Sequence, residues 1–559
     1  GARLLRRWLE RPLTDVNRII QRQDGIEELT GHTTELSQLE EMLEHVFDFE
    51  RILTRIEANT TSPKDLLALK ASLGMIPEIK KLLSGTVSIV LRKLSDQMDI
   101  HSTVYELLDR SMNENGTGNI RDGKYIKEGY SAELDEVRSL SENSRKWIAD
   151  LEEREKEKTG IKLKIGFNNV FGYYFEITNA NKVPIPEYYM RKQTLVNAER
   201  YITPELKEFE TKALSAKEKT EELELKIYQA VKAAIRPEIA AMQRTAKALA
   251  ALDCLTGLSR AALKERYVRP QITNSREGRI SIHDGRHPMV EHALKREMFV
   301  PNDTELNHTD QEMIIITGPN MAGKSTYMRQ VAVLTIMAQT GSFIPAKSAS
   351  FAPVDRIFTR VGAADDISTG QSTFMVEMKE VSHILCNATK NSLILLDEIG
   401  RGTSTYDGMS IARAVVEYLN SKVHAYTLFA THYHELSDMA AENEHIKNYT
   451  VTVKERGKEI TFLRRIVPGS ADKSYGIHVA RLAGLPESLL KRADEILEGL
   501  EVEGIKEEPA APVIRRETAL NLFSSPIIDE LADLDVMSKT PIEAMEILFR
   551  LSKEAKEGR

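Results

Sequence analysis

The amino-acid sequence predicts a multidomain protein: a helical region that carries a small β-rich insertion, then an α/β domain and a short helical C-terminal tail. Three observations predict this architecture. The chain has 559 residues, which is too long for one ordinary domain. Apolar residues recur at helical spacing through most of the first 265 residues. From about residue 270, short apolar runs alternate with helical segments, as an α/β domain requires.

The helical region has recognisable start and packing patterns. Leu4, Leu5 and Trp8 recur at helical spacing. The segment Ser62-Pro63-Lys64-Asp65 has the form of a capping box with proline at the first helical position. Residues 132–157 are charged and amphipathic, which is typical of a long, solvated helix.

The insertion reads as β structure. Residues 161–167 alternate apolar and polar side chains, residues 170–177 are aromatic and β-branched, and Asn168-Asn169 supplies a turn between them. The helical pattern returns after Pro204 and continues to about residue 265. We therefore expect a small sheet at the tip of two long helices.

The insertion is also locally basic. From residue 158 to residue 200, seven basic and three acidic residues give a charge of +4 in a chain of −8. This favours sequence-independent contact with nucleic-acid phosphates, and an ordinary solvated β module is the alternative. The expected contact residues are Lys158, Lys162, Lys164, Asn168, Asn169, Arg191, Lys192 and Arg200.

Composition excludes other classes. A hydrophobic share of 41% and a charged share of 29% fit a folded globular protein. No apolar run is long enough for a membrane span, and no signal peptide is recognisable. Cys254 and Cys386 lie far apart, which argues against a disulfide framework or a zinc site and fits a reducing compartment. The chain opens in what reads as the middle of a helix, so we expect a fragment without upstream domains.

The α/β domain contains a phosphate-binding pattern. Gly318-x-x-x-x-Gly323-Lys324-Ser325 follows an apolar strand at 313–316 and precedes a helical pattern. We expect Lys324 to bind the β- and γ-phosphates of ATP or ADP and Ser325 to ligate Mg²⁺. A chance match in a glycine-rich turn is the alternative. The expected nucleotide contacts are Gly318, Pro319, Asn320, Met321, Ala322, Gly323, Lys324, Ser325 and Thr326.

Two further strands end in residues suited to hydrolysis. The apolar run 393–396 ends in Asp397-Glu398. We expect Asp397 to hold Mg²⁺ and Glu398 to act as the general base on water, although acidic residues that merely cap a strand are the alternative. The run 426–430 is followed by Thr431-His432, and His432 could reach the γ-phosphate or have a structural role.

Together these residues resemble the MutS family, the bacterial ATPases of DNA mismatch repair. The matching motifs are Thr317-Gly-Pro-Asn-Met-Ala-Gly-Lys-Ser-Thr-Tyr-Met-Arg-Gln330, Asp366-Ile-Ser-Thr-Gly-Gln-Ser-Thr-Phe-Met-Val-Glu-Met378, Asp397-Glu-Ile-Gly-Arg-Gly-Thr-Ser-Thr-Tyr-Asp-Gly408, Thr431-His-Tyr-His-Glu-Leu436 and Lys473-Ser-Tyr-Gly-Ile-His-Val-Ala480. The resemblance covers essentially the whole chain. Residues 1–13 are similar to the start of the family's helical core, and residues 167–206 to its DNA-contacting clamp.

The resemblance implies a DNA-dependent ATPase of the ABC class, with a P-loop and two sites shared across a homodimer. Ser372 would complete the partner's site, although a serine with only local hydrogen bonds is the alternative. Phe299 would stack on adenine, and core packing is the alternative. Asn320 would orient the γ-phosphate and water, and His432 would act as the family's switch histidine.

It also implies domains, partners and a location. The homodimer would form mainly through residues 270–500, with a weaker contact from a final helix at Thr540. Double-stranded DNA, MutL and the replication sliding clamp are the other expected partners, in the bacterial cytoplasm at the nucleoid. The expected domains are a helical core and lever at 1–131, a clamp with its flanking helices at 132–220, returning lever helices at 221–268, the ATPase and dimerisation domain at 269–500, a linker at 501–518 and a tail at 519–559.

Two departures from the family pattern matter. No phenylalanine has a glutamate two residues later, so the family's mismatch-reading Phe-x-Glu is absent and we expect DNA binding without mismatch specificity. The segment 519–523 is similar to the family's sliding-clamp-binding peptide, but Ala519 stands where that peptide opens with glutamine. A loose apolar linker segment is the alternative reading.

Other function classes are less consistent with the sequence. A MutS paralogue with an Smr nuclease tail would need a nuclease-like segment after residue 500, which is not present. A chromosome-cohesion ATPase of the ABC class would need much longer heptad helices around a hinge. A non-enzymatic DNA-binding scaffold would require that Lys324 and Glu398 have no role in nucleotide binding or hydrolysis.

Overall fold

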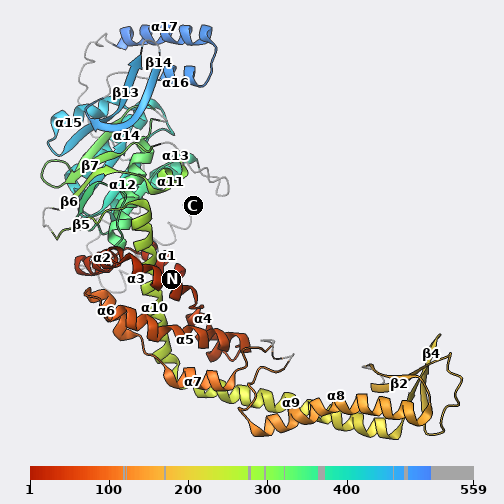
Figure 1. The fold of residues 1–559 in the computed structure, drawn as a ribbon. Helices are drawn as coiled ribbons and strands as arrows, with labels where there is room; N and C mark the ends of the chain where they lie inside the picture. The colour runs from red at the N-terminus through yellow and green to blue at the C-terminus, as the bar shows by residue number, and fades with distance from the viewer. Residues whose placement is uncertain are drawn as a thin grey trace. The chain divides into compact units, whose positions relative to one another are not determined.

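The computed structural model describes residues 1–116, 120, 123–168, 172–274, 278–294, 298–319, 322–362, 372–456, 459–470, 476–504 and 550. The chain forms two compact units, Gly1–His478 and Val479–Arg559, and each is described by itself. The first unit contains the helical region, the small sheet between two long helices, and the α/β region that the sequence predicted (Figure 1).

The helical region packs around one long helix, α10 (Ile239–Glu265), which contacts α2, α3, α4 and α6. The predicted capping box is confirmed, because Ser62 and Asp65 exchange side-chain-to-backbone hydrogen bonds at the start of α5. The other helices are α1 (Ala2–Glu10), α2 (Val16–Gly31), α3 (Thr33–Glu44), α4 (Phe49–Glu57), α5 (Pro63–Leu83), α6 (Ile89–Gln97) and α7 (Ser102–Ser111).

Two long helices, α8 (Ala132–Thr159) and α9 (Pro204–Ile235), lie side by side (Figure 1). The chain between them forms a small antiparallel sheet. Trp147 of α8 stacks on Phe209 of α9 with ring centroids 3.9 Å apart. The sheet has the order β1-β2-β4-β3, with β1 (Leu163–Asn168), β2 (Gly172–Thr178), β3 (Met190–Thr194) and β4 (Ala198–Ile202). The two predicted strands are confirmed, and Asn169 of the predicted turn lies outside the described residues.

The helical pattern that the sequence continues to residue 265 is broken once. A 3₁₀ turn, η2 (Arg236–Glu238), separates α9 from α10. Pro237 lies in this turn, and its missing N–H removes a hydrogen bond that a continuous α-helix would need.

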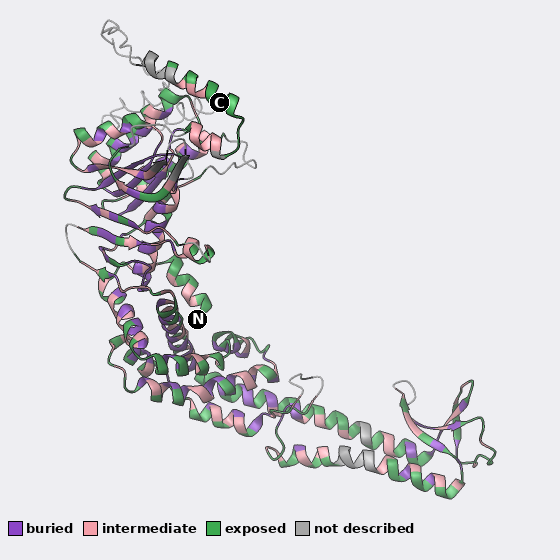
Figure 2. Ribbon diagram, turned by 45° about the horizontal axis from the view of Figure 1, so that its top comes forward, coloured by how far each residue is buried: buried purple, intermediate pink, exposed green. Residues whose placement is uncertain are grey.

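The α/β region is built on a six-stranded sheet of order β10-β11-β12-β8-β13-β14. All neighbours are parallel except β13 and β14, which form an antiparallel hairpin. The predicted strands at 313–316, 393–396 and 426–430 are confirmed as buried parallel strands (Figure 2). The strands are β8 (Met313–Thr317), β10 (Ile357–Arg360), β11 (Leu393–Asp397), β12 (Tyr426–Ala430), β13 (Ile446–Arg456) and β14 (Glu459–Pro468).

Helices cover both faces of this sheet, which explains why its strands read as continuous apolar runs. Ile314 and Ile316 of β8 pack in the cluster that contains Tyr327 of α12, whereas Ile315 packs in the cluster with Val381 of α13. The helices of this region are α11 (Pro288–Ala293), α12 (Lys324–Thr340), α13 (Thr373–Asn387), α14 (Thr405–Tyr418), the π-helical η3 (Leu419–Val423), the 3₁₀ turn η4 (His434–Asp438) and α15 (Met439–Glu442).

A second sheet of the α/β region has the order β5-β9-β6-β7. Its strands are β5 (Gln271–Ile272), β6 (Arg279–Gly285), β7 (Asn302–Asn307) and β9 (Ser348–Phe351). They were not predicted individually, because two of them are only two and four residues long and have little periodicity.

Helix α16 (Gly476–Leu482) runs into the second unit, which contains α17 (Glu487–Gly504). Because α17 continues to Gly504, the first four residues of the predicted linker are helical. The peptide at 519–523 and the final helix expected from Thr540 lie outside the described residues, apart from Arg550.

None of the helices in the described part of the chain has both the length and the apolar composition that crossing a membrane would require.

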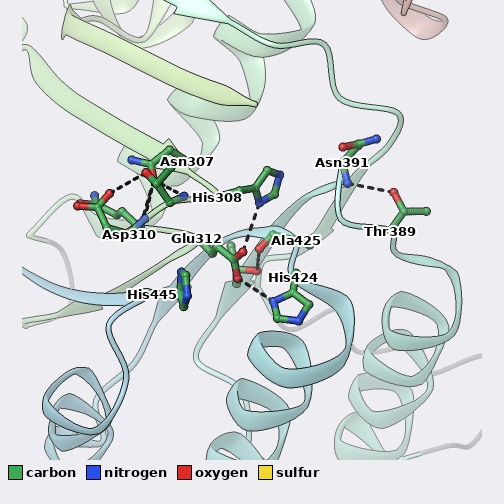
Figure 3. A network of polar contacts seen from close by, with 12 residues as sticks. Asn307, His308, Asp310, Glu312, Thr389, Asn391, His424, Ala425 and His445 are labelled. Atoms are coloured by element: carbon green, nitrogen blue, oxygen red, sulfur yellow. Dashed lines mark hydrogen bonds and ion pairs between the residues drawn. The ribbon is translucent and has the colours of Figure 1, made fainter. Parts of the chain in front are cut away.

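A polar network joins residues that precede β8, β12 and β13 in the chain (Figure 3). Glu312, which precedes β8, is buried, and its carboxylate lies 3.4 Å from His308 Nδ1 and 3.1 Å from His424 Nδ1. Its backbone N–H donates to the carbonyl of His445, which precedes β13. Burial by itself would raise the pKa of Glu312, but the hydrogen bonds with His308 and His424 outweigh it and lower the pKa.

We expect Glu312→Gln to lower the thermal unfolding midpoint of the α/β region at pH 7 by about 2–6 °C, for a loss of about 1–2 kcal/mol. A carboxylate with a lowered folded-state pKa stabilises the fold above the ordinary glutamate pKa of about 4.3, and this contribution disappears as pH falls through the lowered value. Thermal scans at several pH values test this, with the exposed Glu444→Gln as the control. A midpoint difference that is undiminished at pH 3 would contradict the assignment.

Candidate nucleotide-binding site

Three neighbouring parallel strands bring the predicted catalytic segments to one edge. In the sheet, β12 lies between β11 and β8. Asp397-Glu398 ends β11, Thr431-His432 follows β12, and Gly318 follows β8. Because the carboxyl ends of parallel strands share an edge, residues more than 100 positions apart in sequence meet there.

The phosphate-binding pattern forms the link between β8 and α12. Gly323 precedes the helix with φ of +106°, a backbone conformation that side-chain-bearing residues rarely adopt. Helix α12 therefore begins at Lys324, with its first backbone N–H groups available to an anion. Ala322 is buried, and Ser325 and Thr326 are half-buried. Asn320 and Met321 lie outside the described residues.

Lys324 is buried within this loop, with 4% of its surface exposed. Its Nζ donates to the carbonyl of Gly318 and, at 3.2 Å, to that of Pro319. Burial lowers the pKa of Lys324 to about 8, although the carboxylates of Glu398 and Asp397 oppose the shift. A buried ammonium without a full counter-charge is a favourable partner for phosphate.

Asp397 and Ser325 fit a Mg²⁺ site. Asp397 Oδ1 is buried and accepts no hydrogen bond from the described residues. Burial raises the pKa of Asp397, while a hydrogen bond with the Ser325 side chain acts in the opposite direction. A carboxylate beside a hydroxyl is a donor set that Mg²⁺ accepts when phosphate and water complete the shell. Within the described ranges no cluster of three or more His, Cys, Asp or Glu side chains offers a protein-only metal cage.

Glu398 is held as a carboxylate beside His432. Its Oε1 lies 2.6 Å from His432 Nε2, and its other oxygen pairs with the guanidinium of Arg401. Burial would raise the pKa of Glu398, but His432 and Arg401 outweigh it and the pKa is lowered. The carboxylate is therefore ionised at neutral pH, which is the form that accepts a proton. Arg401 was not predicted as a site residue, although it lies in the motif that begins at Asp397.

Two residues expected to reach nucleotide occupy other elements. Ser372 is exposed and caps the N-terminus of α13, where its hydroxyl oxygen accepts a hydrogen bond from Met375 N at 3.2 Å. Phe299 is half-buried in the segment before β7.

The expected DNA contacts divide into two groups. Lys162, Lys164 and Lys192 are exposed. Arg200, in contrast, has only 18% of its side chain exposed, pairs with Glu176 at 3.1 Å and lies over the ring of Tyr174. Its contacts are those of a residue that stabilises the sheet.

The remaining expected contacts, on the small sheet and at the end of α8, also have protein neighbours. Arg191 pairs with Glu199 at 2.9 Å, and Lys158 lies 3.8 Å from Glu155. Asn168 is half-buried.

Sequence reasoning missed two side chains that hold the segment after Glu398. Glu377 of α13 accepts a hydrogen bond from Gly400 N at 2.7 Å, and Tyr433 donates one to Gly400 O at 3.2 Å. Both lie inside motifs that the sequence displays, at 366–378 and 431–436. Nothing in their spacing indicated that they meet at Gly400.

Two known domain families match most of this chain. The family model for MutS domain III matches residues 1–259, and the model for MutS domain V matches residues 314–501, which contain the site.

Curated relatives match along the whole chain, and each is named DNA mismatch repair protein MutS. The protein of Caldicellulosiruptor bescii is 49% identical over 566 residues, covering 99% of this chain and 65% of its own length. That of Clostridium kluyveri is 48% identical over 573 residues, covering 100% of this chain and 66% of its own length. That of Clostridium perfringens is 45% identical over 612 residues, covering 100% and 67%.

The chain thus spans about two thirds of the length of the relatives that it matches, 65% for the first of them. These matches span the helical region and the nucleotide-site motifs alike, because they cover 99–100% of this chain. Because both domain models and these relatives match, the chain belongs to the MutS family of DNA mismatch repair proteins.

Proposed function

We propose that this chain binds and hydrolyses ATP at the edge of the six-stranded sheet, and that the nucleotide state controls a DNA-holding clamp in mismatch repair. The observation that carries the proposal is the proximity of three groups beside one helix N-terminus. They are buried Lys324, Asp397 Oδ1, which accepts no hydrogen bond from the described residues, and the Glu398–His432 pair. A phosphate cradle, a cation ligand and a general base are what phosphoryl transfer to water requires.

Each residue has a distinct proposed role. Lys324 and the loop from Gly318 to Thr326 bind the phosphates, and Ser325 and Asp397 hold Mg²⁺. Bound Mg²⁺ supplies positive charge that neutralises the phosphate oxygens. Glu398 accepts a proton from the attacking water, and His432 orients its carboxylate through the 2.6 Å contact. Asn320 orients the γ-phosphate and water, and Phe299 stacks on adenine.

A direct test measures ATP hydrolysis and native mass together, with and without double-stranded DNA. We expect Mg²⁺-dependent phosphate release, a dimeric mass with bound ATP, and a rate that changes when DNA is added. A chain that binds DNA but releases no phosphate would support a non-enzymatic scaffold instead.

We further propose that each site is completed by Ser372 of the partner in a homodimer, formed mainly by residues 270–500. Support comes from the exposure of Ser372, which caps the N-terminus of α13, the end of a helix that favours negative charge. Each site would then be incomplete in a monomer.

Mixing Lys324→Ala and Ser372→Ala subunits tests this sharing. Each homodimer is expected to be nearly inactive, because both of its sites carry a lesion. In the mixed dimer one site carries both lesions and the other carries neither, so we expect mixing to restore about a quarter of the wild-type ATPase activity. The measurement is steady-state phosphate release against mixing ratio. If mixing restores nothing, Ser372 does not act across the interface.

We propose that the small sheet between α8 and α9 is the DNA-contacting clamp, and that it binds duplex DNA without reading mismatches. The exposed Lys162, Lys164 and Lys192 support this proposal, since they supply charge to phosphates but no base-specific geometry.

We expect Lys164→Ala to weaken binding of matched and mismatched duplexes equally and to reduce the slope of log affinity against log salt by about 1. Fluorescence anisotropy over a salt series measures both quantities. The control is Lys247→Ala, an exposed lysine on α10, which should leave the slope unchanged. A preference for the mismatched duplex, or affinity independent of salt, would contradict the phosphate-contact proposal.

The remaining expectations stay proposals of the same kind. They are the domain boundaries, the location in the bacterial cytoplasm at the nucleoid, binding of MutL, binding of the sliding clamp through 519–523, and a weaker dimer contact from the helix at Thr540.

A further inference from the structure

The peptide at Gly400, two residues after Glu398, is held from both sides. Its N–H donates to the carboxylate of Glu377 at 2.7 Å, and its carbonyl accepts from the hydroxyl of Tyr433 at 3.2 Å. Glu377 is 5% exposed and comes from α13, whereas Tyr433 directly follows His432. Burial and then the Glu377 carboxylate raise the pKa of Tyr433, so its hydroxyl remains a donor at neutral pH.

A close backbone contact holds the same peptide from a third direction. Gly400 has φ of +90°, and a Cβ there would lie 2.5 Å from the carbonyl oxygen of Gly408 in α14. A Cβ on Gly408 would in turn lie 2.2 Å from Gly400 O and 2.5 Å from the Tyr433 hydroxyl. Because only glycine fits at both positions, the backbone is packed against α14 with no room to shift.

Glu398 needs this support because its own backbone is strained. It has φ of +57°, which is uncommon and unfavourable for a residue with a side chain. Such a conformation persists only where the surroundings over-determine it. On one side, Glu398 N donates to Ala430 O at 2.9 Å. On the other side, the chain is held by buried Ile399 and then by the Gly400 peptide.

We propose that Glu377 and Tyr433 are positioning residues that fix the Gly400 peptide and thereby aim the Glu398 carboxylate at the attacking water. This inference rests on the proposed function, in which Glu398 is the general base. It assigns a role to two side chains that need not touch the nucleotide.

Helix α13 also connects the Gly400 contact to the proposed partner contact at Ser372. Ser372 caps α13 and Glu377 lies on the same helix five residues later. If Ser372 meets the partner's nucleotide, a displacement of α13 on partner binding moves the acceptor of the Gly400 N–H. Orientation of the general base in one subunit would then respond to the nucleotide of the other.

The test compares pre-steady-state ATP hydrolysis and ATP affinity for four variants. Glu377→Ala is expected to slow hydrolysis by about 10–100-fold, with ATP affinity within about threefold, because small misplacements of a catalytic group have effects of this size. Glu377→Gln should remain within about threefold of wild type, since its amide oxygen still accepts from Gly400 N.

Tyr433→Phe should slow hydrolysis by about 3–10-fold with the ring and packing retained. Glu380→Ala is the control: it removes an exposed carboxylate from the same helix, where it pairs with Arg360 at 3.0 Å, and should hydrolyse ATP normally.

The decisive measurement is the rate of ATP hydrolysis when the same substitutions are made in a protein that already carries Glu398→Ala. A residue that acts through Glu398 has nothing left to position there, so adding Glu377→Ala or Tyr433→Phe should slow hydrolysis by less than about twofold. A further loss equal to that in the wild-type background, or an equal loss of ATP affinity, would overturn the inference. If Glu398→Ala hydrolyses ATP at the wild-type rate, the proposed function itself fails. If Glu398→Ala is slow while Glu377→Ala and Tyr433→Phe are both normal, only this inference fails.

Discussion

Lys324→Ala is expected to weaken ATP binding at least about 100-fold, a loss of about 2.7 kcal/mol. The side chain is 4% exposed and its ammonium lies within the loop between β8 and α12. There it is a buried positive charge within the proposed phosphate loop, and charge-assisted hydrogen bonds to phosphate are among the strongest available. Truncation removes that charge and leaves the loop carbonyls of Gly318 and Pro319 without their donor.

Equilibrium binding of a fluorescent ATP analogue measures the effect. Lys347→Ala, which removes an exposed lysine from the same region, is the matched control and should bind normally. Unchanged affinity in Lys324→Ala would end the assignment of the loop as the phosphate site.

The same measurement has a pH dependence that follows from the low pKa of Lys324, about 8. Below this pKa the ammonium is already present in the free protein. Above it, binding must first take up a proton, so wild-type affinity should fall as pH rises beyond about 8, approaching tenfold per pH unit. The Lys324→Ala variant should lack this dependence.

The second large effect is expected for Glu398→Ala, which should retain ATP binding and slow hydrolysis by at least about 100-fold, the low end for a general base. The carboxylate is held by His432 and Arg401 with a lowered pKa, so it is an ionised base in the resting site. Its loss removes the proton acceptor and leaves the phosphate loop intact.

Rapid-quench measurement of the first turnover separates this chemical step from product release. Glu417→Ala removes an exposed carboxylate from α14 and should give the wild-type burst. A burst of product at the wild-type rate in Glu398→Ala would exclude Glu398 as the base.

Local sequence patterns were sufficient for predicting most elements and for proposing the phosphate loop. The capping box at Ser62, the alternation in β1 and the apolar runs of β8, β11 and β12 each depend on contacts with near neighbours or on burial of a whole strand. The loop is equally local, because its glycines, lysine and serine act within eight consecutive residues. Short strands such as β5 escaped prediction because two residues carry no periodicity.

The amino-acid sequence by itself therefore determined the helical and α/β regions and the family motifs, and it predicted where a phosphate loop lies. Only the tertiary structure decided how the site is completed. The strand order places His432 beside Glu398, and the packing of α13 and α14 places Glu377 and Gly408 against Gly400. The tertiary structure also showed that Arg200 pairs with Glu176 and lies over the ring of Tyr174. The physical reason is that hydrogen bonding, desolvation and steric fit depend on distances between residues remote in sequence, which no local pattern specifies.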